Sequence, residues 1–237
     1  MTQRLRYGPH PEQFGDLRLP AATGPHPVII VIHGGFWRAA YDLNHVAPFC
    51  DALTAAGFAT WNVEYRRLGN GGGWPETFED VALAAQQPQC SPCAVAVGHS
   101  AGGHLALLLA HHALVAGAVS LAGVADLRRA QELNLSRGVV DEFLGGYPPE
   151  EASPAVLLPS GVPVRLLHGL RDEIVPPEIS TNYVDRAKLA GQDAELLALP
   201  ETGHFELVNP ESLQWPEVYR TIAEISAMVC SSSSSVV

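Results

Sequence analysis

The chain has 237 residues, of which 47% are hydrophobic and 16% are charged, and its formal net charge is −11. This much apolar material supports one large folded domain and excludes an intrinsically disordered chain. The negative charge disfavours a role in nucleic-acid binding, because phosphate groups would be repelled. We therefore expect a protein that acts on small molecules.

Strands and helices are predicted to alternate along the chain. Apolar, β-rich runs predict strands at 27–35, 58–66, 93–97, 117–124, 162–172 and 194–200. Amphipathic or Leu/Ala-rich segments predict helices at 45–57, 76–87, 101–111, 176–191 and 215–229. This alternation predicts a doubly wound, mostly parallel sheet with helices on both faces.

The predicted domain organisation is simple. Residues 1–230 form a single domain, within which 125–159 form a short lid-like insertion, and 231–237 form a disordered tail. The run from Leu105 to Val124 approaches membrane-spanning length. Because His111 and His112 interrupt it and Gly117 divides it, we expect a buried helix followed by a buried strand, with no membrane association.

Neither the cysteines nor the first residues suggest secretion. The four cysteines do not form the framework of a small disulfide-stapled domain, although Cys90 and Cys93 have C-x-x-C spacing. No second such pair completes a zinc site, and we expect no metal and no cofactor. The opening residues MTQRLRYGPHPEQ contain no apolar stretch of the kind found in signal peptides, which favours a cytoplasmic location.

A serine lies between an apolar strand and a helix in the sequence GHSAG, residues 98–102. This is the G-x-S-x-G pattern of a nucleophile elbow in its required strand–turn–helix setting. Such a turn lifts the hydroxyl above the sheet and directs the helix N-terminus at it, where developing negative charge is stabilised. Ser100 is therefore the predicted nucleophile.

A serine hydroxyl needs a base, and the base needs an acid. His204 lies in the loop between the last predicted strand and the last helix, which returns to the edge of the sheet where Ser100 points. Asp172 follows the predicted strand at 162–172 and is the expected acid, with Asp126 as the first alternative and Glu173 as the second. The order Ser100, Asp172, His204 matches the order expected for this arrangement.

Backbone N–H groups should stabilise the oxyanion of the reaction. The HGGFW sequence, residues 33–37, follows an early strand and places two glycines at its end. Gly35 and Phe36, together with Ala101 after the nucleophile, are the expected donors, and Gly34 is a further candidate. His33 is expected to brace the loop by hydrogen bonding.

At these residues the chain resembles the α/β-hydrolase superfamily over nearly its whole length. HGGFW and GHSAGG make it similar to kynurenine formamidases (arylformamidases) and to hormone-sensitive-lipase-like esterases. The resemblance implies Ser100 as nucleophile, Asp172 as acid, His204 as base and the Gly35–Phe36 turn as the oxyanion site. It implies hydrolysis of a small carboxylic ester or an N-formyl or aryl amide through an acyl-enzyme, with a small or absent lid.

The candidate substrate-binding residues are Trp37, Trp74 and His99. Trp74 lies in the glycine-rich loop 68–75, and a packing role for it is the alternative. Two other functions remain open on the sequence: a peptidase of the prolyl-oligopeptidase type, and a non-catalytic binding protein on a hydrolase fold. A homodimer is an open possibility for the assembly.

Overall fold

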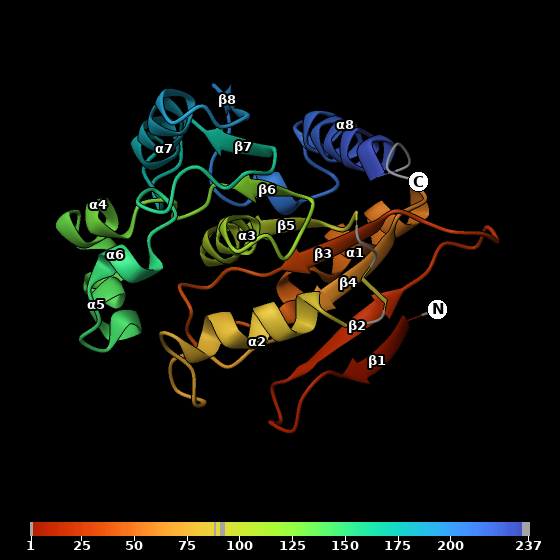
Figure 1. Ribbon diagram of the computed structural model, residues 1–237, viewed down its shortest axis with the longest axis horizontal. Helices are drawn as coiled ribbons and strands as arrows, with labels where there is room; N and C mark the ends of the chain where they lie inside the picture. The colour runs from red at the N-terminus through yellow and green to blue at the C-terminus, as the bar shows by residue number, and fades with distance from the viewer. Residues whose placement is uncertain (1, 88, 91–92, 234–237) are drawn as a thin grey trace.

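The computed structural model describes residues 2–87, 89–90 and 93–233. An eight-stranded sheet runs through it in the order β1-β2-β4-β3-β5-β6-β7-β8 (Figure 1). The strands are β1 (Thr2–Arg6), β2 (Phe14–Arg18), β3 (Val28–Ile32), β4 (Ala59–Val63), β5 (Val95–His99), β6 (Gly117–Leu121), β7 (Val164–Gly169) and β8 (Ala194–Leu199). All pairings among β3 to β8 are parallel, which confirms the predicted mostly parallel sheet of the α/β-hydrolase fold.

Helices cover both faces of the sheet. They are α1 (Ala47–Ala55), α2 (Glu76–Ala85), α3 (Ala101–His111), α4 (Leu127–Glu132), α5 (Val139–Leu144), α6 (Pro149–Ala152), α7 (Glu178–Leu189) and α8 (Trp215–Ser233). Alternate residues of β3 enter opposite cores: Ile30 and Ile32 pack with α2, α3 and α7, whereas Ile29 and Val31 pack with α1 and α8. The run of apolar residues in this strand therefore reflects burial on both faces.

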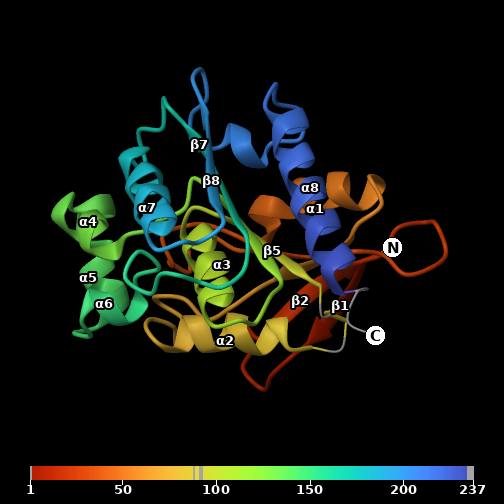
Figure 2. The same cartoon turned by 45° about the horizontal axis from the view of Figure 1, so that its top comes forward.

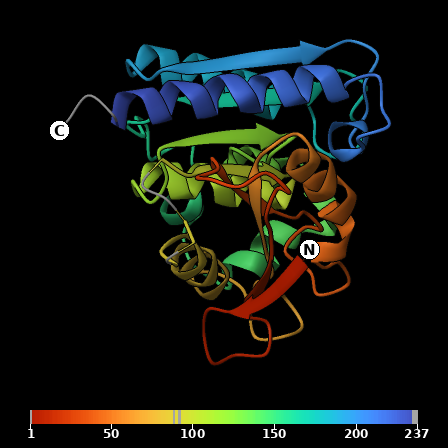
Figure 3. The ribbon, with the colours of Figure 1, turned by 90° about the vertical axis from the view of Figure 1, so that its right-hand side faces the viewer.

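The sheet ends in different ways on its two sides. Figure 3 shows β8 and α8 at one end of the molecule and β1 at the other. Strands β1 and β2 form an antiparallel hairpin that joins β4, and neither strand was predicted from the sequence. The reason is that β1 is a polar edge strand with almost no buried side chain, so it carries little of the hydrophobic pattern that identifies a strand.

The C-terminal helix is longer than predicted. Helix α8 continues to Ser233, so the expected disordered tail is wrong for residues 231–233, and residues 234–237 lie outside the described part of the chain. The run from Leu105 to Val124 is divided as predicted, since α3 ends at His111 and β6 begins at Gly117. Among the described residues, no helix is both long enough and apolar enough to cross a bilayer.

The predicted insertion, residues 125–159, forms α4, α5 and α6. In Figures 1 and 2 these helices gather beside α7, on the opposite side of the molecule from α1 and α8. They pack on the core through fully buried side chains, including Leu127, Val139 and Phe143. This packing makes the segment part of the domain's core.

The two cysteines of the C-x-x-C spacing contact different parts of the chain. Cys93, just before β5, has its Sγ atom 2.8 Å from Sγ of Cys230 in α8. Cys90 Sγ instead contacts the carbonyl oxygen of Ala84 at 3.6 Å. The contact of Cys93 therefore joins the start of β5 to the C-terminal helix.

Candidate active site

Ser100 occupies a sharp turn between β5 and α3. Its φ of 56° and ψ of −119° lie in a strained region for a residue with a side chain. A Cβ atom at Gly98 would lie 1.9 Å from the carbonyl oxygen of Gly102, and a Cβ at Gly102 would lie 2.1 Å from that of Ile32. The turn therefore requires glycine on both sides of the serine.

Gly98→Ala is expected to lower the free energy of unfolding by about 3 kcal/mol or more, because its methyl group would overlap fixed backbone atoms. Thermal or urea unfolding measures the loss. Gly191→Ala is the matched control: Gly191 has φ of +78° and open space around its Cβ position, so only conformational strain of about 1–2 kcal/mol is added. A smaller loss at Gly98 than at Gly191 would contradict the packing of the elbow.

The predicted acid and the predicted base lie in the loops that follow β7 and β8. Asp172 Oδ2 accepts a hydrogen bond of 2.6 Å from His204 Nδ1, and its Oδ1 accepts the backbone N–H groups of Ile174 (2.8 Å) and Val175 (2.9 Å). His168 Nε2 lies 3.2 Å from Oδ2. Burial opposes ionisation of Asp172, but the hydrogen bonds from His168 and His204 outweigh it and hold the pKa of this carboxyl well below its usual range.

The two alternative acids lie elsewhere. Asp126 caps the N-terminus of α4 by accepting the backbone N–H of Arg129 at 3.1 Å, and Arg186 NH1 lies 3.4 Å from its other oxygen. Glu173 is exposed. Of the three acids considered, Asp172 is the one that pairs with His204.

A cavity of about 90 Å³ lies above the elbow. It is lined by Gly35, Phe36, Tyr41, His45, His99, Ser100, Ile174, His204 and Phe205. The predicted nucleophile and the predicted base therefore border the same space. No residue of the insertion 125–159 is among these lining residues, so the segment does not act as a lid over this cavity.

Two further histidines border the cavity beside His204. His99 Nε2 donates to the carbonyl oxygen of His204 at 2.9 Å, and burial followed by the nearby charge of His204 lowers the pKa of His99 well below its usual value. The pKa of His45 is lowered mainly by burial and then by the charges of His33 and His204. Both imidazoles are therefore neutral at pH 7, and they surround His204 by hydrogen bonding and packing without adding charge.

The HGGFW loop, which we define as residues 33–43, lies against the elbow. A Cβ at Gly34 would come within 2.9 Å of the carbonyl oxygen of His99, so this backbone packs directly on the turn. Gly35 and Phe36 line the cavity with φ of +111° and +50°. Ala101 is the first residue of α3, where N–H groups have no partner within the helix. These positions suit the donors expected at the oxyanion.

The three candidate substrate-binding residues have different surroundings. His99 lines the cavity. Trp37 is fully buried instead, stacked on Phe143 with ring centroids 4.4 Å apart. Trp74 packs against Phe78 and Phe143. Neither tryptophan is among the residues that line the cavity. Trp74 therefore has the packing role that was the alternative to substrate binding, and Trp37 has a packing role as well.

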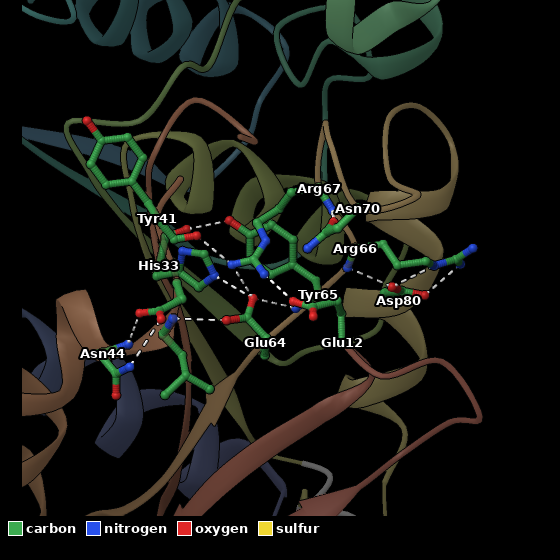
Figure 4. A network of polar contacts seen from close by, with 12 residues as sticks. Glu12, His33, Tyr41, Asn44, Glu64, Tyr65, Arg66, Arg67, Asn70 and Asp80 are labelled. Carbon is green, nitrogen blue, oxygen red and sulfur yellow. Dashed lines mark hydrogen bonds and ion pairs between the residues drawn. The ribbon is translucent and has the colours of Figure 1, made fainter. Parts of the chain in front are cut away.

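Several residues at the site were missed by the sequence analysis. Four of them line the cavity: Tyr41, His45, Ile174 and Phe205. Phe205 directly follows His204 in the sequence, and Ile174 lies two residues after Asp172. This closeness to the predicted base and acid was the sequence signal that could have identified them. A group of buried charges behind the HGGFW loop, centred on Glu64 and Arg67, was also missed (Figure 4). Its signal was the charged sequence EYRR directly after an apolar strand.

Comparison with known proteins gives one family and several relatives. A model of the BD-FAE family matches residues 16–186. Esterase LipC of Mycobacterium tuberculosis is 28% identical over 245 residues, covering 87% of this chain and 60% of LipC. The probable carboxylic ester hydrolase LipM of the same organism is 29% identical over 222 residues, covering 78% of this chain and 51% of LipM. The chain thus spans about half to three-fifths of the length of these relatives.

Solved structures of esterases share the fold. A truncated carbohydrate esterase from gut microbiota has a TM-score of 0.83 at 20% identity, with 96% of each chain covered. Esterase 2 of Thermogutta terrifontis with propionate bound has a TM-score of 0.80 at 20% identity, with 96% of this chain and 94% of that chain covered. At this identity the likeness establishes the architecture and not the substrate.

Proposed function

Because the chain belongs to the BD-FAE family, an esterase family of the α/β-hydrolase fold, we propose that it is a serine hydrolase of small, neutral carboxylic esters. The observation that carries the proposal is the pairing of Asp172 with His204 at 2.6 Å beside a cavity that Ser100 also lines. An oriented imidazole that shares a cavity with a hydroxyl on a strained turn is the arrangement that acyl transfer requires.

The proposed mechanism uses only side chains and backbone groups of this chain. The hydrogen bond from Nδ1 to Asp172 leaves the Nε2 lone pair of His204 available as the base. It removes the proton of Ser100 as Oγ attacks the ester carbonyl, and N–H groups at Phe36 and Ala101 stabilise the oxyanion. His204 then protonates the departing alcohol, and water repeats the sequence to release the acid.

The cavity favours short, uncharged acyl groups. Its volume is about 90 Å³, and its lining contains no lysine, arginine, aspartate or glutamate. The net charge of −11 also disfavours anionic substrates. Acetyl, propionyl and formyl esters or amides match these properties.

We expect kcat/KM to be at least about tenfold higher for p-nitrophenyl acetate than for p-nitrophenyl decanoate, because a cavity of about 90 Å³ leaves most of a decanoyl chain without contacts to its walls. The hydrolysis rates of a series of p-nitrophenyl esters measure this preference. Ile174→Ala should shift it toward butyrate and hexanoate, since Ile174 forms part of the wall. Leu213→Ala is the control, because this side chain is 93% exposed and does not line the cavity. Equal rates across the series would contradict a small acyl site.

Hydrolysis of an aryl formamide is the second candidate function. Two aromatic side chains that line the cavity reach solvent, Tyr41 at 53% and Phe205 at 54% exposure. Such a rim suits stacking of an aromatic leaving group. Comparing kcat/KM for N-formylkynurenine with that for p-nitrophenyl acetate separates the candidates, and a large preference for the formamide would replace the esterase proposal.

A further inference from the structure

The HGGFW loop has three consecutive residues in the left-handed region. The φ angles are +111° at Gly35, +50° at Phe36 and +55° at Trp37. Phe36 and Trp37 carry side chains, so this backbone costs conformational energy and persists only where surrounding contacts hold it. The contacts that fix this turn therefore also fix the N–H groups proposed for the oxyanion.

Glu64, directly after β4, holds the loop at its two ends (Figure 4). Its Oε2 accepts the backbone N–H of Leu43 at 3.1 Å, and its Oε1 lies 2.9 Å from His33 Nε2. Tyr65 adds a hydrogen bond of 2.7 Å from its hydroxyl to the carbonyl oxygen of His33, and its ring stacks on the imidazole at 4.5 Å. The Glu64 carboxylate thus binds both the first residue of the loop, His33, and its last residue, Leu43.

Arg67 holds the same loop at a third point. Its guanidinium donates to the carbonyl oxygen of Tyr41, and NH1 lies 2.8 Å from Glu64 Oε1. Tyr41 in turn packs across the turn, since a Cβ at Gly35 would lie 2.5 Å from Tyr41 Cβ. Arg67 also pairs with Glu12, so this buried guanidinium contacts two acids, Glu64 and Glu12.

The hydrogen bonds of His33 define its protonation state. Nδ1 lies 2.7 Å from the carbonyl oxygen of Gly34, which can only accept, so Nδ1 carries a proton. On the other side, Glu64 Oε1 already receives the Tyr65 N–H at 2.9 Å and faces Arg67, and these donors favour the carboxylate over the acid. The proton between Glu64 and His33 therefore belongs to Nε2, and the ring is an imidazolium.

We propose that Glu64 is a positioning residue that keeps His33 as a buried imidazolium and thereby fixes the HGGFW loop for catalysis. The effect on catalysis rests on the proposed function. His33 is 0% exposed, Glu64 1% and Arg67 3%, so no solvent substitutes for a lost partner. The titratable or charged groups around the ring are Glu64, Tyr65, Arg67, Glu12 and His45.

The variant Glu64→Gln keeps the size of the side chain and removes its charge. We expect kcat for p-nitrophenyl acetate to fall on the order of 10- to 100-fold, because displacement of an oxyanion donor acts on the transition state. KM should change by less than about threefold, because ground-state binding in the cavity is retained. A merely structural role would lower stability without this split between kcat and KM.

Asp80→Asn is the matched control. Asp80 is also a fully buried carboxylate, and it is paired with Arg66 through contacts of 2.7 and 2.9 Å (Figure 4). It also accepts a hydrogen bond of 2.6 Å from Gln13. None of its described contacts reaches the HGGFW loop. We expect this variant to lose stability and to keep kcat. A wild-type kcat in Glu64→Gln, or an equal loss of kcat in both variants, would overturn the proposal.

The protonation state can be measured in the unmodified protein, whether or not Glu64→Gln folds. We expect ¹⁵N NMR of histidine-labelled protein at pH 8 to show protons on both ring nitrogens of His33, assigned through its contact with Tyr65. The neutral pattern at His33 would overturn the proposal. The NMR measurement does not depend on hydrolysis. If His33 is an imidazolium but the protein cleaves no ester, the result contradicts the proposed function and leaves the role of Glu64 toward His33 intact.

Discussion

Ser100→Ala is expected to lower kcat for p-nitrophenyl acetate by about 10⁶-fold, the effect of removing a serine nucleophile from a hydrolase triad. Without Oγ no acyl-enzyme can form, and the residual rate comes from the oxyanion donors and from binding alone. Initial rates at saturating ester measure the loss. The absence of acetylated protein by mass spectrometry after mixing with the ester provides a second readout.

The fold of this variant should be unchanged. Alanine occupies the same strained turn as serine, and the glycines on either side still relieve the steric contacts. Circular dichroism and the unfolding midpoint must therefore match those of the parent protein. Residual turnover above about one percent in a folded variant would show that another nucleophile performs the reaction, and would contradict the assignment of Ser100.

Asp172→Asn is expected to lower kcat by about 10⁴-fold. The amide can donate a hydrogen bond where the carboxylate accepts one, which would favour the wrong tautomer of His204 and remove the charge that stabilises its protonated form. Because the pKa of Asp172 lies below its usual range, the parent carboxylate stays ionised between about pH 6 and 8, and its own titration should not contribute to the pH dependence of the parent kcat there.

Asp126→Asn tests the choice of acid. Asparagine is as good a helix N-cap as aspartate, so its bond to the N–H of Arg129 can be kept and little stability should be lost. We expect kcat within about twofold of the parent value. An inactive Asp126→Asn together with an active Asp172→Asn would move the role of the acid to Asp126.

Much of the site could be predicted because its signals are local. A nucleophile elbow needs small residues at fixed offsets from the serine, and the steric contacts at Gly98 and Gly102 show why GHSAG can be read from five letters. The alternation of apolar strands and helices is likewise a property of short segments, and it predicted the parallel sheet. Parallel strands place the loops that follow them at one edge, which is how residues as distant as Ser100 and His204 could be expected together.

Other features depend on contacts between distant segments. From the sequence, Trp37 and Trp74 are equally good candidates for substrate binding. Their packing against Phe143, which only the folded structure shows, directs both side chains toward the core. Strand β1 is polar and becomes a strand because β2 pairs with it.

The sequence by itself determined the fold class and the chemistry proposed for this protein, namely the hydroxyl of Ser100, the turn that carries it and the order of the proposed acid and base. The tertiary structure decided which acid reaches His204, which side chains enclose a cavity of about 90 Å³, and which buried charges hold the HGGFW loop. The physical reason is the distance along the chain over which each interaction acts. Backbone sterics and hydrophobic periodicity act within a few residues, whereas cavities and ion pairs such as the one between His33 and Glu64 join segments that only folding brings together.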